Sequence, residues 1–229
     1  MHVLTIIITA SFISSHPEIK IIQETIESLQ LINIPHDTEI ILAHDYNNHI
    51  NYIIYFEKLN DYIKSYSNIK IIQRKDHGHL TGNIRNALSY VNSKYILIIQ
   101  HDLPFIKMFD IQKVIYDMEE NDKIKYVRFN KRRNIKAGYD KLNNLFGLQV
   151  KQANYTYTRT PAWSDNNHLC LTRYYTDIVM KKCPDGCPME LKLRLKNKNK
   201  KLHNKYGTYL FGELNHPQVI KHTDGKHTK

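Results

Sequence analysis

Short apolar runs recur along the first half of the chain, and each is rich in β-branched side chains. Runs of this length without polar alternation predict strands that are buried on both faces of a parallel sheet. Between them, apolar residues recur at helical spacing, which predicts amphipathic helices. The strands are expected at 3–8, 39–43, 69–73 and 95–99, and the helices at 16–29, 52–66 and 83–90.

The alternation of strands and helices predicts a doubly wound α/β fold with a mostly parallel sheet and right-handed crossovers. The pattern weakens after residue 105. There we expect helices at 111–118, 174–180 and 189–195, and strands at 126–129 and 169–171. A chain of 229 residues is long enough for one sizeable core, so residues 1–229 are expected to form a single domain.

Polar residues stand at the carboxyl ends of three predicted strands, where the ligand crevice of an open α/β sheet lies. Thr9-Ala10-Ser11 follows the first strand, His44-Asp45 the second and Gln100-His101-Asp102 the fourth. These positions are candidates for ligand binding. A single Asp followed by Leu-Pro, as at Asp102, is also typical of a simple turn, so its role depends on the other motifs.

The chain carries 33 Lys and Arg against 22 Asp and Glu, a net charge of +11 with a pI of about 9.4. Such an excess indicates an anionic partner: a nucleotide diphosphate, a nucleic acid or a membrane surface. Part of it reflects a bias toward Lys, Asn, Ile and Tyr that is typical of an AT-rich genome. The apolar run at 3–8 is too short for a signal peptide, and no segment approaches a membrane span, so we expect a soluble, cytoplasmic protein.

The three cysteines, Cys170, Cys183 and Cys187, are an odd number without secretory context, which makes a disulfide framework unexpected. We therefore expect a reducing compartment. Cys183 and Cys187 could form a zinc site with nearby His203. The spacing matches no established zinc pattern, however, and a fourth ligand is not evident.

Missing motifs exclude several enzyme classes. The first strand is not followed by the glycine-rich turn that a dinucleotide-binding oxidoreductase requires. The chain has neither a P-loop nor a Gly-x-Ser-x-Gly elbow, which excludes P-loop NTPases and α/β-hydrolases. A non-enzymatic nucleic-acid-binding module stays open as an alternative, because Lys131-Arg132-Arg133 and the Lys-rich run at 196–205 could contact phosphates.

In order and spacing, these motifs resemble the nucleotide-sugar-dependent glycosyltransferases of the GT-A fold, most closely those of family 2. The resemblance covers the first half of the chain well and the second half only in short pieces. It is carried by Thr9-Ala10-Ser11, by the acid Asp45, by the glycine loop His77-Gly78-His79 before a helix with Arg85-Asn86, and by Gln100-His101-Asp102. Among family members, the chain is similar to those of large-DNA-virus type.

The resemblance implies a GT-A, Rossmann-like fold in which residues 1–105 bind the nucleotide sugar and residues 106–229 form a smaller acceptor side. It implies a hexosyltransferase-type enzyme of glycan biosynthesis with a UDP-sugar as donor and a glycan or glycoconjugate hydroxyl as acceptor. Nucleic acid is then not expected as a partner. The donor-binding residues that the resemblance implies are Thr9, Ala10, Ser11, Asp45, His79, Arg85 and His101.

The same resemblance implies a divalent metal ion at Asp102. The family motif usually has two acids around one residue, whereas here Asp102 is the sole carboxylate. One carboxylate suffices in principle, because phosphate oxygens and water complete the coordination of Mn²⁺ or Mg²⁺. His222 resembles the late histidine that supplies a further ligand in several GT-A enzymes, and an imidazole ligand favours Mn²⁺. The alternative for His222 is a surface position in a C-terminal tail.

Two carboxylates are candidates for the catalytic base of an inverting transfer. Asp165 lies in the polar cluster Trp163-Ser164-Asp165-Asn166, where the Trp ring could stack on a sugar while the Asp deprotonates its hydroxyl. The cluster resembles the acidic motif on the acceptor side of some inverting members. Glu190 is the competitor, although an acid at a helix start also simply complements the helix dipole. Asp165 is our first candidate.

Overall fold

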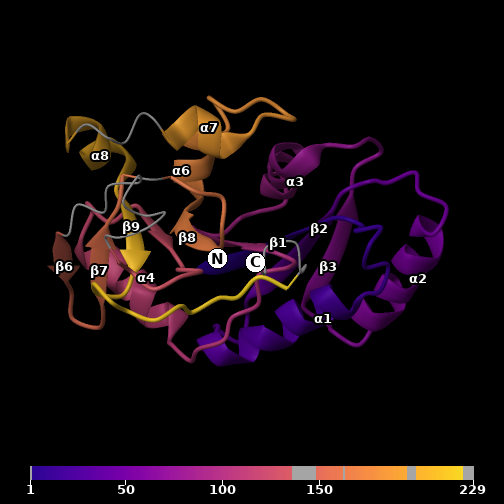
Figure 1. Ribbon diagram of the computed structural model, residues 1–229, viewed down its shortest axis with the longest axis horizontal. Coiled ribbons are helices and arrows are strands. Elements are labelled where there is room, and N and C mark those ends of the chain that lie inside the picture. The colour runs from indigo at the N-terminus through magenta and orange to yellow at the C-terminus, as the bar shows by residue number, and fades with distance from the viewer. Residues whose placement is uncertain (1, 136–147, 162, 195–199, 224–229) are drawn as a thin grey trace.

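The computed structural model describes residues 2–135, 148–161, 163–194 and 200–223. Within these ranges nine strands form one continuous sheet with the order β3-β2-β1-β4-β8-β5-β9-β7-β6. Helices cover both faces of the sheet, which gives three layers (Figure 1). The predicted fold class, α/β with a mostly parallel central sheet flanked by helices, is confirmed.

The first half of the chain builds the parallel part of the sheet. Its strands are β1 (Leu4–Ala10), β2 (Glu39–His44), β3 (Ile69–Gln73) and β4 (Tyr95–Gln100), and neighbours among them pair in parallel. All four match predicted strands. β1 is longer than expected, since Thr9 and Ala10 are strand residues paired with Ala43 and His44. The four carboxyl ends therefore lie at one edge of the sheet.

The two faces of these strands have separate cores. One face packs against α1 (Lys20–Glu27) with the 3-10 helix η1 (Ser28–Ile32), α2 (Tyr52–Ile63) and α4 (Ile111–Glu120). The opposite face packs against α3 (His79–Leu88) and the helices after residue 171. Because successive strand residues point to opposite faces, Ile6 belongs to the first core and Ile7 to the second.

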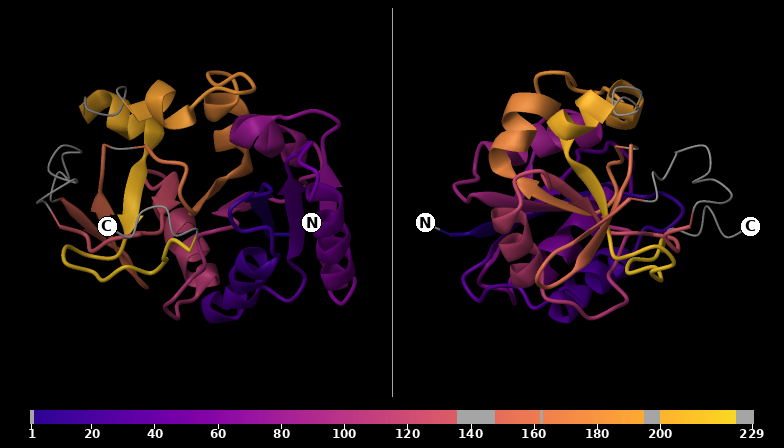
Figure 2. Two further views of the ribbon diagram at one scale, coloured as in Figure 1. Left: turned by 45° about the vertical axis from the view of Figure 1, so that its right-hand side comes forward. Right: turned by 90° about the vertical axis from the view of Figure 1, so that its left-hand side faces the viewer.

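The second half extends the sheet beyond β4 with strands of both directions. β8 lies between β4 and β5 and is antiparallel to both. The helices after β8 lie on the same side of the sheet as α3, as Figure 2 shows. The elements in chain order are β5 (Tyr126–Arg128), β6 (Gln149–Lys151), β7 (Thr156–Arg159), β8 (His168–Leu171), α6 (Thr172–Tyr174), the π-helix η2 (Tyr175–Val179), α7 (Met189–Arg194), α8 (Lys200–Tyr206) and β9 (Thr208–Phe211).

Several details of the secondary-structure prediction are wrong: α1 begins at Lys20 and not at residue 16, and β9 is unexpected. α3 begins at His79 and not at residue 83, so Thr81 and Gly82 are buried helix residues. The segment looks like a loop in the sequence because it is polar and contains two glycines, but Gly82 lets the helix lie close to the Arg74 side chain. The strands β6 and β7 are unexpected, because the residues around them show little periodicity.

After β9 the chain returns to the carboxyl end of β4. Phe105 and Ile220 form an antiparallel bridge, and the backbone N–H of Lys221 donates to the carbonyl of Pro104 at 3.1 Å. The yellow segment of Figure 1 follows this path across the sheet. It brings His222 to the edge where the parallel strands end.

The helices of the described ranges are short. The longest, α2, has 12 residues, and none is long and apolar enough to cross a membrane.

Candidate active site

Asp45 is held at the carboxyl end of β2 by donors from the loop after β3. Its side chain is buried, with Oδ1 accepting a hydrogen bond from the N–H of Gly78 at 2.8 Å and Oδ2 lying 3.0 Å from Nδ1 of His77. A buried carboxylate without such partners would be costly. The N–H of Asp45 donates to the carbonyl of Ala10 at 2.8 Å. Three strand ends therefore meet at this residue.

His44 supports Asp45 from behind. The ring is fully buried, with Nδ1 2.8 Å from the carbonyl of Asp45 and Nε2 3.2 Å from the hydroxyl of Tyr55. Burial lowers the pKa of His44 to about 4. The imidazole is therefore neutral at physiological pH.

The end of β1 is closely packed. The Thr9 hydroxyl donates to the carbonyl of Ile99 at 3.2 Å, and the Thr9 carbonyl accepts the N–H of His101 at 3.0 Å. The His101 ring lies beside the same carbonyl, with Nδ1 at 3.3 Å. Thr9, Ala10 and His101 are all buried, whereas the side chain of Ser11 is partly exposed.

Asp102 and His222 meet at the carboxyl end of β4. Nε2 of His222 lies 3.2 Å from Oδ2 of Asp102. Thr223 donates its N–H, at 3.0 Å, and its hydroxyl, at 3.1 Å, to the carbonyl of Asp102, which holds the C-terminal segment against the turn. The structure thus brings together the two residues that were expected at a metal ion. Asp224, which follows them in the sequence, lies outside the described residues.

The Asp102 and His222 pair fits a divalent ion that is shared with a diphosphate. Such an ion needs only one or two protein ligands, and Mn²⁺ accepts both carboxylate oxygen and imidazole nitrogen. In the described part of the chain, no group of three or more His, Cys, Asp or Glu side chains could hold a metal. The described residues therefore offer no site for a metal held by protein ligands alone. The same holds for the zinc site considered at Cys183, Cys187 and His203.

Asp165 and Glu190, the two candidates for the catalytic base, are neighbours. Burial and then the negative charge of Glu190 and a hydrogen bond to it raise the pKa of Asp165 to about 7. Ser164 donates its hydroxyl to Oε1 of Glu190 at 2.5 Å and accepts Nδ2 of Asn166 at 2.6 Å. A carboxyl group with a pKa near neutrality is suited to proton transfer.

The segment that carries Asp165 also holds the turn that carries Asp102. The side chain of Asn167 is fully buried, with Oδ1 accepting the N–H of Gln100 at 3.0 Å and Nδ2 donating to the carbonyl of Leu103 at 2.7 Å. Nε2 of Gln100 donates to the carbonyl of Asp165 at 3.1 Å. These three hydrogen bonds fix the candidate metal ligand and the candidate base relative to each other.

Trp163 does not line the site. Its side chain is 1% exposed and packs against Tyr126 and His168, with ring centroids 5.8 and 6.0 Å away. The prediction that this ring stacks on a sugar is wrong. Instead, Trp163 fills the core behind the polar segment.

His79 and Arg85 both lie on α3 and face the loop before α7. His79 has a left-handed φ of 52°, and its ring packs on that of His77 with centroids 4.2 Å apart. Nε of Arg85 donates to Oδ1 of Asp185 at 2.8 Å, and Nη2 donates to the carbonyl of Cys183 at 2.7 Å. Arg85 therefore joins the two halves of the chain, and its role in donor binding stays a prediction, as does that of His79.

Three residues of this site were not predicted: His77, Ser164 and Asn167. The first two stand inside motifs that the sequence singles out, next to predicted residues. Only the backbone path decides that His77, and not His79, contacts Asp45. Asn167 carries no local signal, because its partners Gln100 and Leu103 are distant in the sequence.

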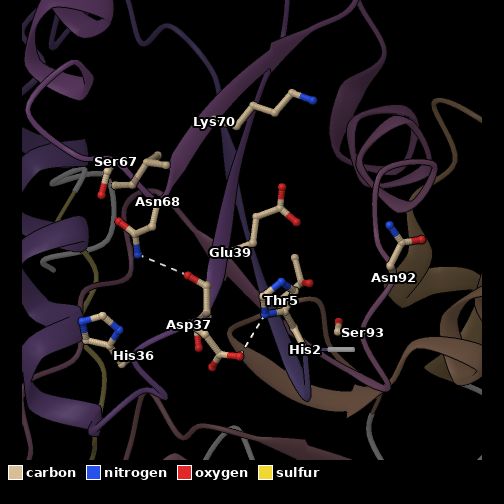
Figure 3. Close-up of a pocket in the computed structure, with 12 residues that line it drawn as sticks. His2, Thr5, His36, Asp37, Glu39, Ser67, Asn68, Lys70, Asn92 and Ser93 are labelled. Atoms are coloured by element: carbon tan, nitrogen blue, oxygen red, sulfur yellow. Dashed lines mark hydrogen bonds and ion pairs between the residues drawn. The ribbon is translucent and has the colours of Figure 1, made fainter.

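A separate cavity of about 390 Å³ opens at the opposite edge of the sheet (Figure 3). It is lined by residues at and before the amino ends of the parallel strands, among them Thr5, Glu39, Lys70 and Ser93. His2 and Asp37 form an ion pair of 3.0 Å there. Because ligands of α/β sheets bind at the carboxyl edge, we assign the candidate site to the edge with Asp45, Asp102 and Asp165.

Comparison with known sequences identifies the family. Residues 11–175 match glycosyl transferase family 2. This range contains the strand-end residues Asp45 and Asp102 as well as Asp165, whereas Glu190 and His222 lie beyond it. No curated protein sequence matches the chain.

Several solved structures share the fold. Staphylococcus aureus TarS in complex with UDP-GlcNAc has a TM-score of 0.62 at 15% identity, covering 99% of this chain and 60% of that one. The mannosyltransferase PcManGT from Pyrobaculum calidifontis, in complex with GDP-Man and Mn²⁺, has a TM-score of 0.59 at 11% identity, covering 98% and 58%. A cytidylyltransferase from Leptospira borgpetersenii has a TM-score of 0.56 at 12% identity, covering 93% and 77%.

The chain thus spans about 60% of the length of the TarS structure, and these identities show a common fold only. The family match covers most of the chain and includes the strand-end acids that carry the predicted site. The alternative of a non-enzymatic nucleic-acid-binding module is therefore set aside. The chain belongs to glycosyl transferase family 2 and has the GT-A fold.

Proposed function

We propose that the protein transfers a sugar from a UDP-sugar to a hydroxyl group of a glycan or glycoconjugate, with a divalent metal ion and with inversion at the anomeric carbon. The arrangement at one sheet edge carries the proposal: Asp45 with its donor loop, Asp102 beside His222, and Asp165 paired with Glu190. We assign Asp45 to the nucleoside, the pair of Asp102 and His222 to the diphosphate, and the pair of Asp165 and Glu190 to the acceptor.

Asp45 is proposed to bind the nucleobase of the donor. A carboxylate can accept the imide N–H of uracil, and the N–H of Gly78 and the ring of His77 hold this carboxylate in place. The crystal structure of TarS with UDP-GlcNAc supports a uridine nucleotide. The further residues that we propose around the donor are Thr9, Ala10, Ser11, His79, Arg85 and His101.

Asp102 and His222 are the residues proposed to hold the metal ion, Mn²⁺ before Mg²⁺. When bound, such an ion neutralises the negative charge that develops on the leaving diphosphate. The Mn²⁺ in the PcManGT complex supports this choice. The role of the chain itself is to orient Asp102, which Asn167 does by clamping Gln100 and Leu103.

Asp165, in its ionised form, is the proposed general base. It takes the proton of the acceptor hydroxyl while the hydroxyl oxygen attacks the anomeric carbon, and UDP leaves with the electron pair of the broken bond. A single displacement of this kind inverts the anomeric carbon. Because the pKa of Asp165 is raised to about 7, the group is ionised in about half of the molecules at neutral pH and is basic enough to accept the proton.

Thermal denaturation with nucleotides tests the donor and metal assignment. UDP together with Mn²⁺ should raise the Tm, because a ligand that binds only the folded state stabilises it, by about 2.7 kcal/mol at a hundredfold excess over Kd. GDP and CDP with Mn²⁺, and UDP with EDTA, are the controls. A Tm that no nucleoside diphosphate raises would contradict the proposal. Hydrolysis of a panel of UDP-sugars then identifies the sugar, and NMR of the product reports its anomeric configuration.

A further inference from the structure

A tight turn connects Cys183 to Cys187 in the loop before α7. The N–H of Cys187 donates to the carbonyl of Pro184 at 3.1 Å, and Gly186 has a φ of 74°. A positive φ at the third position of such a turn is readily adopted only by glycine or asparagine. The chain therefore reverses direction over Pro184 to Cys187, with Asp185 at the tip.

The turn is fastened to the first half of the chain by four side-chain contacts. Asp185 accepts Nη1 of Arg74 at 2.9 Å and Nε of Arg85 at 2.8 Å. Arg85 also donates to the carbonyl of Cys183 at 2.7 Å, and the Thr81 hydroxyl donates to the carbonyl of Cys187 at 2.6 Å. Figure 1 shows this loop beside α3. We call the four contacts the Asp185 clamp.

The clamp fixes the backbone at both cysteines. Arg85 and Thr81 bind the carbonyls of Cys183 and Cys187, and a hydrogen bond to the Cys187 thiol is among the causes that raise the pKa of Cys183. Cys183 is fully buried, whereas Cys187 is partly exposed. Cys170 is on β8, under the sheet face, and is fully buried. Only one thiol of the pair is therefore open to a reagent.

We propose that Cys183 and Cys187 form a reversible disulfide that fastens the turn in its clamped form. Turn geometry, clamp and thiol proximity carry the inference, which does not depend on the identity of the donor or acceptor. The turn also lies against α3 at His79, since an added Cβ on Gly186 would be 3.6 Å from its ring. The disulfide would thus act on the contact between the two halves.

The reaction is a thiol–disulfide exchange with a small-molecule disulfide such as oxidised glutathione. The exposed thiol of Cys187 loses its proton and attacks one glutathione sulfur, which releases one glutathione and leaves a mixed disulfide. Cys183 then attacks the sulfur of Cys187 and releases the second glutathione. Two protein thiols are oxidised and one glutathione disulfide is reduced to two thiols. Burial, and then the neighbouring Cys187, raise the pKa of Cys183 to about 11, which makes Cys187 the group that reacts first.

The clamp and the disulfide should stabilise each other. The clamp fixes the backbone at the two cysteines, so it raises the equilibrium constant for closing the bond. By linkage, the bond raises the stability of the clamp by the same factor. Asp185 makes two ion pairs of a kind that contributes up to about 1 kcal/mol each, so its loss should lower the constant by roughly threefold to tenfold.

The experiment equilibrates the full chain in glutathione redox buffers, followed by alkylation, thiol counting and peptide mapping. We expect the free thiols to fall from three to one, with Cys183 joined to Cys187. The Cys170→Ser variant should form the same bond, and Cys187→Ser should form none within the chain. Three remaining thiols at every ratio, or a bond that includes Cys170, would overturn the proposal.

The coupling has its own test. Asp185→Asn keeps the size of the side chain but removes its charge, so the constant for disulfide formation should fall by threefold to tenfold. The matched control is Asp177→Asn, since Asp177 is exposed and pairs only loosely with Lys181 at 3.7 Å. An unchanged equilibrium constant in Asp185→Asn would show that the two sulfurs pair without the clamp. It would overturn the proposal that the clamp and the disulfide stabilise each other.

Discussion

Nε2 of His222 lies 3.2 Å from Oδ2 of Asp102, although the two residues belong to opposite halves of the chain. Asp102 is placed by the end of β4, and His222 by the returning C-terminal segment that Thr223 binds to the carbonyl of Asp102. Both side chains are largely buried, at 12% and 19% exposure. A metal ion bound here would therefore link the C-terminal segment to the centre of the sheet.

Replacement of Asp102 by Ala should abolish the Mn²⁺-dependent rise of the Tm with UDP, because, among the described residues, its carboxylate is the only acid proposed to bind the metal. The side chain contributes little to the core, so the folded state should persist. His222→Ala should weaken metal affinity less. Thermal denaturation with UDP, with and without Mn²⁺, measures both effects.

Asp37→Ala is the matched control, since Asp37 lies at the opposite edge of the sheet in an exposed ion pair with His2. It should respond to Mn²⁺ and UDP as the parent does. If Asp102→Ala also kept the full response, Asp102 would be a residue of the turn only, and the metal assignment would be wrong.

Asp165→Asn should separate binding from chemistry. The amide keeps the shape and can donate a hydrogen bond to Glu190, but it cannot take the proton of the acceptor. Turnover should fall by about 10²–10⁴, the usual contribution of a general base, while the Tm rise with UDP and Mn²⁺ remains. Initial rates of sugar transfer measure the first effect.

Glu190→Gln is the companion variant, because the charge of Glu190 and a hydrogen bond to it help to raise the pKa of Asp165. Here we expect a smaller loss and a lower apparent pKa in the rate profile, since removal of the negative charge beside Asp165 eases its ionisation. Near-parental activity in Asp165→Asn, together with a large loss in Glu190→Gln, would assign the base to Glu190. A product that retains the anomeric configuration would exclude the inverting mechanism.

The sequence predicts the first half of the molecule well because its signals are local. The β-branched runs that become β1 to β4 are continuous, and the acids Asp45 and Asp102 directly follow two of them. Parallel strands place their carboxyl ends at one edge, so the position of both acids follows from the strand order. The contact of Asp165 with Glu190 does not follow in this way, because it depends on how the loop after β7 meets the start of α7.

The error at Trp163 has a physical origin. Trp163 looks like a binding residue beside a polar cluster, yet burial of its large ring in the core is more favourable than exposure. The ring packs against Tyr126, a residue that is distant in the sequence, and local patterns do not reveal such a contact.

Asn167→Ala should lower both stability and metal affinity. The change leaves the N–H of Gln100 and the carbonyl of Leu103 without buried partners, which should cost roughly 2–4 kcal/mol of unfolding free energy. It should also release the turn that presents Asp102, so the Mn²⁺ concentration that is needed for UDP binding should rise. Chemical denaturation and Mn²⁺ titration give the two values.

Asn134→Ala separates positioning from stability. Asn134 is another buried Asn whose Nδ2 donates to several carbonyls, among them those of Phe211 and Glu213, away from the site. Its loss should destabilise the protein similarly without a change in the Mn²⁺ titration. Equal titration midpoints in Asn167→Ala and Asn134→Ala would mean that Asn167 has only a structural role.

The raised pKa of Asp165 should make the protein less stable as the pH rises. The unfolded carboxyl has a pKa near 3.8 and the folded one about 7, so between these values the folded state binds more protons. The free energy of unfolding therefore falls as the pH rises across this window. Above pH 7 the full loss of stability that the ionisation of Asp165 causes is present. Asp165→Asn removes the cost, so at pH 8 the variant should be more stable than the parent by roughly 1–3 kcal/mol.

Denaturant unfolding of both proteins at pH 4 and pH 8 measures this difference. At pH 4 the folded parent holds the proton and the advantage of the variant should nearly vanish, because neither protein then carries the charge of Asp165. The same ionisation should appear in kcat/KM, which should rise with pH through an apparent pKa near 7 that belongs to the pair of Asp165 and Glu190. A variant that is less stable than the parent at both pH values would show that the carboxylate of Asp165 stabilises the fold, and it would remove the reason to assign proton transfer to this group.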